Sequence, residues 1–189
     1  MSRRLAIAAA WVCLSITAAN VHAFDAAPAP LAAHGTLEAA FAPWDNVESL
    51  ILDALGAAKK QVMVQTYLLT SKKVAATLIA AQKRGVEVRV LADAEQAAKV
   101  ELSKLPELAA AGIPVWLETK YQNAHNKIIL IDAGTADATL ITGSFNFTWS
   151  AQHKNAENIL IARKNPTLAA RYALNWERHK LDATPYKKP

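Results

Sequence analysis

The sequence has a single cysteine, Cys13, which excludes a disulfide scaffold and a zinc site built from thiolates. Neither sign of charge is in large excess: the sequence has 21 Lys and Arg and 16 Asp and Glu, which gives a formal net charge of +5. With 52% hydrophobic and 20% charged residues, the chain is too apolar for a disordered protein and too charged for a polytopic membrane protein. Its 189 residues predict one domain.

The N-terminal apolar run, residues 5–19, is shorter than the roughly 20 residues of a membrane-spanning helix, which disfavours a membrane anchor. Arg3 and Arg4 precede the run, and Val21 and Ala23 are the small residues that a signal peptidase reads. We predict a signal peptide over residues 1–23, cleaved after Ala23, with export to the periplasm or beyond and no stable membrane insertion afterwards. Residues 24–34, rich in Ala and Pro, form a flexible leader, and residues 35–189 form the domain.

The domain alternates short apolar runs with amphipathic stretches. This pattern predicts an α/β fold with a mixed β-sheet and helices on both of its faces. Segments 125–132 and 138–143 are separated by a turn-like stretch and predict an antiparallel hairpin. The predicted strands are 36–42, 61–69, 86–92, 113–118, 125–132, 138–143 and 158–163, and the predicted helices are 46–60, 71–85, 94–111 (broken before Pro106) and 166–181.

Five polar residues are expected to converge at one end of the predicted hairpin. His125 and Lys127 are two residues apart and therefore share a strand face. Ser144 and Asn146 directly follow the returning strand, and Glu157 begins the next one. Gln65 and Tyr67, on one face of an earlier strand, are candidate pocket-lining residues. We expect Phe145, Phe147 and Trp149 to belong to the core in preference to stacking on nucleobases, with the alternative that one of them lines the cleft.

This set of side chains suits phosphoryl transfer without a metal or cofactor. Lys127, Ser144 and Asn146 can donate hydrogen bonds to phosphate oxygens, where negative charge resides in the transition state. The His125 imidazole can attack phosphorus, and Glu157 can hold one of its ring nitrogens. Asp132 lies seven residues after His125, on the opposite strand face, and is expected to support the fold through turn or backbone hydrogen bonds.

Residues 125–132 (HNKIILID) followed by residues 143–146 (GSFN) resemble the HxKx4D…GSxN signature of the phospholipase D superfamily. Residues 143–148 (GSFNFT) and 64–71 (VQTYLLTS) are similar to its small periplasmic endonucleases with a single motif, over residues 36–181 or so. The resemblance implies a phospholipase D-like fold with one HKD motif per chain. The ten residues between Asp132 and Gly143 exceed the usual turn, and the extra length lies at the far tip of the hairpin.

By the same resemblance, His125 is the nucleophile that forms a phosphohistidine. Lys127, Ser144 and Asn146 bind phosphate, and Glu157 orients the imidazole. Asp132 is the aspartate of the motif, in the supporting role described above.

The favoured hypothesis is an exported, metal-independent endonuclease that hydrolyses DNA, with RNA as a second candidate substrate. A rival is a phospholipase D or cardiolipin hydrolase that cleaves phospholipid diesters. A third alternative is a nucleic-acid-binding module without turnover. The small size and the GSFNFT stretch favour the nuclease.

A two-step transfer through histidine uses two imidazoles, one as nucleophile and one as acid and base. Larger members of the superfamily carry two motifs in one chain, whereas here no second His-x-Lys occurs. We therefore predict a homodimer whose active site is shared across the two-fold axis.

Overall fold

A computed structural model of the chain describes residues 28–187. The predicted signal peptide and the start of the predicted leader lie outside these residues. Residues 28–34, the rest of that leader, are exposed and have no regular structure. The described residues contain no helix long and apolar enough to cross a bilayer.

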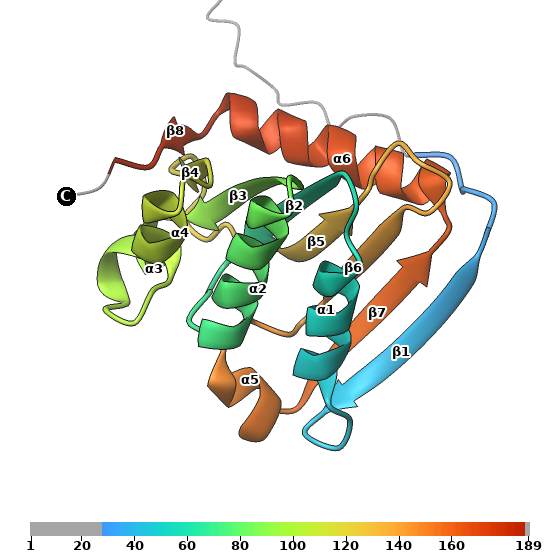
Figure 1. Ribbon diagram of the computed structural model, residues 1–189, viewed down its shortest axis with the longest axis horizontal. Helices are drawn as coiled ribbons and strands as arrows, with labels where there is room; N and C mark the ends of the chain where they lie inside the picture. The colour runs from blue at the N-terminus through green and yellow to red at the C-terminus, as the bar shows by residue number, and fades with distance from the viewer. Residues whose placement is uncertain (1–27, 188–189) are drawn as a thin grey trace, which may run out of the picture. The chain divides into compact units, whose positions relative to one another are not determined.

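The centre of the domain is one mixed eight-stranded sheet in the order β1-β7-β6-β5-β2-β3-β4-β8 (Figure 1). Strands β2, β3 and β4 are parallel, and every other neighbouring pair is antiparallel. The predicted antiparallel hairpin is confirmed as β5 and β6. The strands are β1 (Thr36–Ala42), β2 (Gln61–Thr66), β3 (Glu87–Asp93), β4 (Val115–Glu118), β5 (Lys127–Ile131), β6 (Thr139–Gly143), β7 (Glu157–Arg163) and β8 (Thr184–Pro185).

Helices cover both faces of the sheet, as the sequence pattern predicts. On one face α1 and α2 lie side by side (Figure 1), and they enclose a core that contains Ile51, Leu78 and Ile129. On the other face α6 packs through Trp176 on Leu91 and Leu130. The helices are α1 (Val47–Gly56), α2 (Lys72–Lys83), α3 (Ala94–Lys99), α4 (Leu105–Ala110), α5 (Trp149–His153) and α6 (Pro166–Leu181).

The predicted elements differ from the observed ones mainly at their ends. The strand 36–42 and the helix 166–181 are found with the same bounds, because a cap or a clear alternation marks each end. The predicted helix 94–111 is two helices, of which the second has Pro106 in its first turn. Helix α5 and the short strand β8 have no counterpart among the predictions.

Candidate active site

The hairpin β5–β6 lies between β2 and β7 and brings distant parts of the chain to one edge of the sheet. Gly143 ends β6, where β7 comes unusually near: a Cβ at this position would lie 2.2 Å from the Asn158 carbonyl oxygen. Only glycine fits there without moving backbone. This close approach places Ser144 beside the first residues of β7, which include Glu157.

The His125 side chain is exposed and lies against the ring of Tyr67. Residue 125 precedes β5 instead of lying within it, because the strand begins at Lys127. The two ring centres are 4.4 Å apart in an edge-on arrangement. The Tyr67 amide donates to the Asn126 carbonyl at 3.0 Å, and its hydroxyl donates to Asn123 Oδ1 at 3.3 Å. Tyr67 therefore holds the segment that carries the candidate nucleophile, and its role as a pocket-lining residue stays a prediction.

Lys127 is a buried ammonium whose side chain turns back toward His125. The residue is only 5% exposed, and its Nζ donates to the His125 carbonyl oxygen at 2.8 Å. The same atom lies 4.9 Å from the centre of the Tyr67 ring. Burial lowers the pKa of Lys127 to about 8, and the negative charge of Glu157 counteracts part of this effect. His125, Lys127 and Glu157 thus lie at the same edge of the sheet.

Ser144, directly after β6, and Glu157, at the start of β7, form a hydrogen-bonded cluster. The Ser144 hydroxyl donates to Glu157 Oε2 at 2.5 Å and accepts from the Asn158 amide at 3.1 Å. The second Glu157 oxygen accepts from the Asn155 side-chain amide at 2.9 Å. No hydrogen bond joins Glu157 to the His125 ring within the described chain, so the orientation of His125 by Glu157 remains a prediction.

Asn146 lies in the loop that leaves β6 and is partly buried. Its Oδ1 atom is buried and has no hydrogen-bond partner among the described residues. Such unpaired polar atoms are uncommon in folded proteins and gather at functional positions. The loop is held in place because the Phe147 carbonyl accepts from the amides of Thr70 and Ser71, at the start of α2.

Asp132 directly follows β5, at the end of the strand away from His125, whereas its odd spacing from His125 concerned only the strand face. Its buried carboxylate accepts from the backbone amides of Lys59, Lys60 and Gln61 at 2.6–3.2 Å. These bonds hold the connection between α1 and β2, which explains why α1 ends at Gly56 and not at the predicted residue 60. Asp132 supports the fold and does not contact the His125 end.

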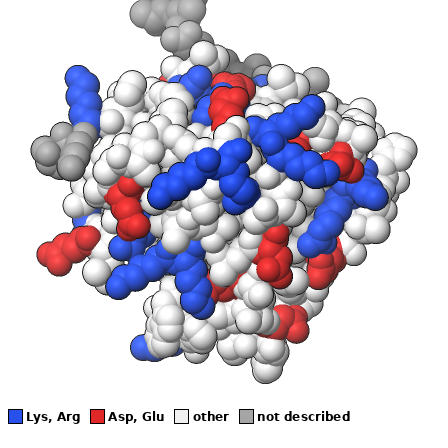
Figure 2. Space-filling model, viewed as in Figure 1, with Lys and Arg blue, Asp and Glu red and all other residues white. Residues whose placement is uncertain are grey.

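The described residues contain no group of three or more His, Cys, Asp or Glu placed to hold a metal ion. On the face formed by α1 and α2, basic and acidic side chains are interspersed (Figure 2), so this face has no continuous basic surface. The site chemistry therefore has to be sought at the sheet edge, in the imidazole, ammonium, hydroxyl and amide described above.

A family model described as "Cardiolipin synthase, PLD-like domain" matches residues 51–180, which include these four residues and Glu157. The chain belongs to the phospholipase D superfamily.

Relatives in the superfamily have different names. A protein named phospholipase D from Rickettsia prowazekii is 39% identical over 136 residues, which are 72% of this chain and 63% of the relative. A mitochondrial cardiolipin hydrolase from Mus musculus is 33% identical over 113 residues, 60% of this chain and 49% of the relative. The chain thus spans less than two thirds of the length of either relative.

Among solved structures, the phospholipase D family member Nuc from Salmonella typhimurium superposes with a TM-score of 0.75 at 28% identity. The match covers 81% of this chain and 99% of Nuc. NucT from Helicobacter pylori superposes with a TM-score of 0.68 at 17% identity over 80% of this chain and all of NucT, a likeness that concerns the fold alone. The phospholipase D-like α/β fold predicted from the sequence is confirmed.

Gln65 does not join the other predicted residues of this phospholipase D-like site. It is fully buried on the α6 side of the sheet, and its amide nitrogen donates to both oxygens of Glu118, the closer at 3.0 Å. The expectation that it shares a face with Tyr67 is wrong because β2 ends at Thr66, so the alternation of side chains does not continue to residue 67.

Asp93 is a site residue that the motif reasoning missed. Its carboxylate is 1% exposed and accepts from the Gln96 amide, capping α3, and from the Ala124 amide, both at 2.8 Å. The second bond fixes the residue directly before His125. The sequence signal was an aspartate between an alternating strand and a helix, which is typical of an N-cap.

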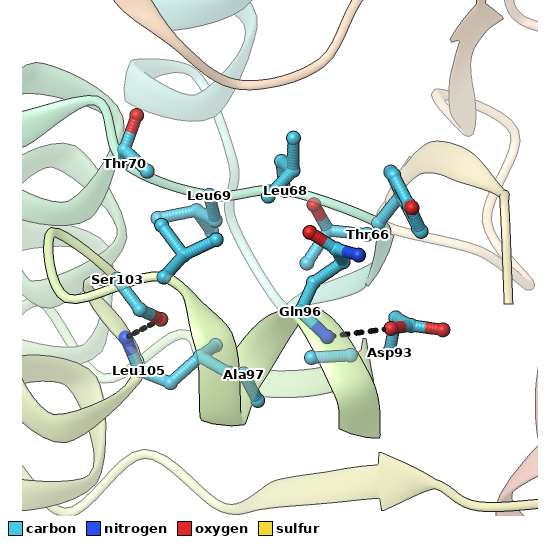
Figure 3. Close-up of a pocket in the computed structure, with 12 residues that line it drawn as sticks. Thr66, Leu68, Leu69, Thr70, Asp93, Gln96, Ala97, Ser103 and Leu105 are labelled. Carbon is cyan, nitrogen blue, oxygen red and sulfur yellow. Dashed lines mark hydrogen bonds between the residues drawn. The ribbon is translucent and has the colours of Figure 1, made fainter. Parts of the chain in front are cut away.

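The small cavity beside Asp93 does not extend the site. It is lined by Asp93 at the end of β3, Gln96 in α3 and Thr66 at the end of β2, together with Leu68 and Leu69 of the loop that follows β2 (Figure 3). Its volume of about 10 Å³ has room for a single water molecule and excludes a nucleotide or lipid headgroup.

Proposed function

We propose that this protein is an exported, metal-independent phosphodiesterase that hydrolyses nucleic acid through a phosphohistidine at His125. The observation that carries the proposal is the exposed His125 imidazole next to the buried Lys127 ammonium, at the edge that also carries Ser144 and Asn146. An imidazole nitrogen attacks phosphorus, the bond from phosphorus to the oxygen of the leaving strand breaks, and that oxygen takes a proton from the second imidazole. Water then attacks phosphorus and gives its proton back to that imidazole, while the phosphorus–nitrogen bond breaks and releases His125.

The other residues stabilise the charge that develops on the phosphate oxygens. Lys127 supplies a positive charge, and Asn146 supplies hydrogen bonds through its side-chain amide. The Ser144 hydroxyl has a single proton, which it donates to Glu157, so Ser144 binds phosphate only after this proton turns from Glu157 to the substrate. Glu157 also keeps part of the Lys127 charge in place. Its predicted contact with the His125 ring would add orientation of the nucleophile.

Nucleic acid is favoured over lipid by two features. Nuc, whose whole length this chain matches, is as small as this domain, whereas the relatives named phospholipase D are longer. The residues after Asn146 also form a short helix with one exposed apolar side chain, Trp149, instead of the broad apolar face that docks on a bilayer. Lipid phosphodiesters remain the second candidate because relatives carry the names phospholipase D and cardiolipin hydrolase.

The test is to incubate the purified protein with supercoiled plasmid and single-stranded oligonucleotides, and separately with cardiolipin vesicles, in excess EDTA. We expect cleavage of nucleic acid that persists in EDTA and is abolished in His125→Ala. Turnover of cardiolipin alone would contradict the choice of substrate. Loss of activity on chelation with recovery in magnesium would contradict the metal-free mechanism.

We further propose that the active unit is a homodimer with the site shared across its two-fold axis. One chain has one HKD motif and one candidate nucleophile, while the reaction uses a second imidazole as acid and base. An apolar strip of Leu37, Phe41 and Leu160 lies exposed on the α6 side of β1 and β7. In the β1–β7 register Phe41 is paired with Asn158, the residue after Glu157. A second copy that covers the strip would lie beside the strand that begins with Glu157.

A further inference from the structure

The connection from Asn146 to Glu157 forms the rim of the site and contains helix α5. At its start the Thr148 amide donates to the Asn146 carbonyl at 2.7 Å, and the Thr148 hydroxyl caps α5 by accepting from the Ala151 amide. At its end Asn155 donates to Glu157. Both ends of the connection therefore belong to the site itself, and any long substrate bound at Asn146 must pass over or beside α5.

Trp149, the first residue of α5, presents its indole to solvent. Its exposed fraction is 58%, whereas Phe145 and Phe147 of the same segment are 2% exposed. The expectation that all three belong to the core is thus correct for the two phenylalanines and wrong for Trp149. Thr148, in extended conformation, starts the helix and directs residue 149 away from the core.

A histidine and a lysine side chain accompany this indole. The His153 ring lies 4.7 Å from it at an interplanar angle of 37°, and Lys154 Nζ lies 5.4 Å from the ring centre. Lys154 has no ion pair within the described residues. Lys72, exposed at the start of α2, also has none there, and the neighbouring Ser71 amide is bonded to the Phe147 carbonyl. The Trp149 ring is therefore bordered by the Lys154 ammonium, and Lys72 follows the Ser71 residue whose amide is bonded to the same loop.

We propose that Trp149 is a stacking platform for a nucleobase next to the scissile phosphate, with Lys154 and Lys72 binding the adjoining backbone phosphates, so that the protein selects single-stranded nucleic acid. This inference rests on the proposed function. A base can stack on an indole only when it is free of its own neighbours, as in a single strand. A bilayer contact fits less well, because the other exposed residues of α5, Ser150 and His153, are polar.

The experiment compares Trp149→Ala and Trp149→Phe with a control, Trp44→Ala. Trp44 is 84% exposed but lines a groove together with Glu38 and Asp45, where phosphate is repelled. Each variant is assayed on three probes: a single-stranded oligonucleotide, the same oligonucleotide with abasic sites around one labelled phosphate, and methyl 4-nitrophenyl phosphate. Circular dichroism and thermal unfolding establish that each variant is folded.

We expect Trp149→Ala to reduce oligonucleotide cleavage relative to cleavage of the small diester by about ten-fold or more, since one stacked base contributes roughly 1–3 kcal/mol. Trp149→Phe should restore most of the ratio of oligonucleotide cleavage to small-diester cleavage. On the abasic oligonucleotide, Trp149→Ala and wild type should cleave at the same rate. Trp44→Ala should behave as wild type on all three probes. An equal loss on intact and abasic strands would overturn the stacking role.

A separate arm distinguishes this inference from the proposed function. If wild type cleaves oligonucleotides and Trp149→Ala is unaffected, the inference fails while the proposed function stands. If wild type cleaves only lipid, both fail. If Trp149→Ala binds cardiolipin vesicles more weakly than wild type and still cleaves oligonucleotides normally, Trp149 contacts a bilayer and does not stack on a base.

Discussion

Lys127 combines a positive charge with burial, and this combination makes the activity sensitive to alkaline pH. Burial lowers its pKa from 10.5 to about 8, so the ammonium loses its proton as the pH rises through 8. Because only the charged form stabilises phosphate oxygens, we expect kcat/KM to fall above pH 8. The fall of kcat should occur at higher pH, because the negative charge of the bound phosphate raises the pKa of Lys127 in the enzyme–substrate complex. A pH profile of both constants measures this.

Glu157→Gln provides the internal check on this assignment. The Glu157 carboxylate raises the Lys127 pKa against the effect of burial, so its removal should move the alkaline limb of kcat/KM to lower pH. Lys127→Arg should remove the limb altogether while losing much of the activity, because guanidinium stays charged but fits the ammonium site poorly. A limb that is unchanged in both variants would assign the titration to another group.

At this scale, sequence spacing located some residues and misplaced others for a definite reason. Asp132 is held by backbone amides in the turn after β5, beyond the regular alternation that runs from Lys127 to Ile131. The pairing of Gln65 with Tyr67 failed because β2 ends at Thr66, and Trp149 was misplaced because it begins a helix too short to show a helical period. The double hydrogen bond of Asp93 was invisible because its second partner, Ala124, is 31 residues away.

At the scale of elements, the segment between β4 and β5 has to hold His125 without being part of a strand. Asp93 holds this segment from the end of β3, and the Tyr67 hydroxyl holds it through Asn123. Asp93→Asn leaves one acceptor oxygen for two amide donors, so the Ala124 contact should weaken. We expect a loss of about 1–3 kcal/mol in the free energy of unfolding and a fall in kcat of about 10-fold or more.

Asn165→Ala is the matched control for Asp93→Asn. Asn165 caps α6 by accepting from the Leu168 amide, and its loss should destabilise the fold by roughly 0.5–2 kcal/mol. The affected helix end follows the end of β7 that is opposite to Glu157. Urea unfolding and kcat per folded molecule are measured for both variants. If kcat falls no further in Asp93→Asn than in the control, Asp93 has a structural role only.

Elements with strong local signals were the ones that the sequence predicted well. Helix α6 has Asn165 as its cap, Pro166 in its first turn and three basic residues in its last turn, so both of its ends were marked. Helix α5 has five residues, too few to show a helical period, and forms through contacts with residues distant in sequence. Helix α5, which forms the rim of the site, could therefore not be predicted from the sequence.

At the scale of the whole molecule, subunit mixing tests whether the site is shared. Wild-type and His125→Ala chains are combined in varying ratios, unfolded and refolded together, and assayed on oligonucleotide. Heterodimers with a single imidazole should be nearly inactive, so activity should fall as the square of the wild-type fraction. A linear fall, or an active monomer in sedimentation, would contradict the shared site.

Helix α5, which carries the proposed base-stacking residue, is attached to the fold independently of the residues proposed to carry out the reaction. The helix is held by Gln152, which bonds to the Asp45 carbonyl and the Glu48 amide, and none of its residues belongs to a sheet strand. Substitutions on its outer surface can accumulate without disturbing His125 or Lys127. Under the proposed role of Trp149, substitutions in the connection that contains α5 would change which substrate binds and would leave the residues that carry out the reaction unchanged.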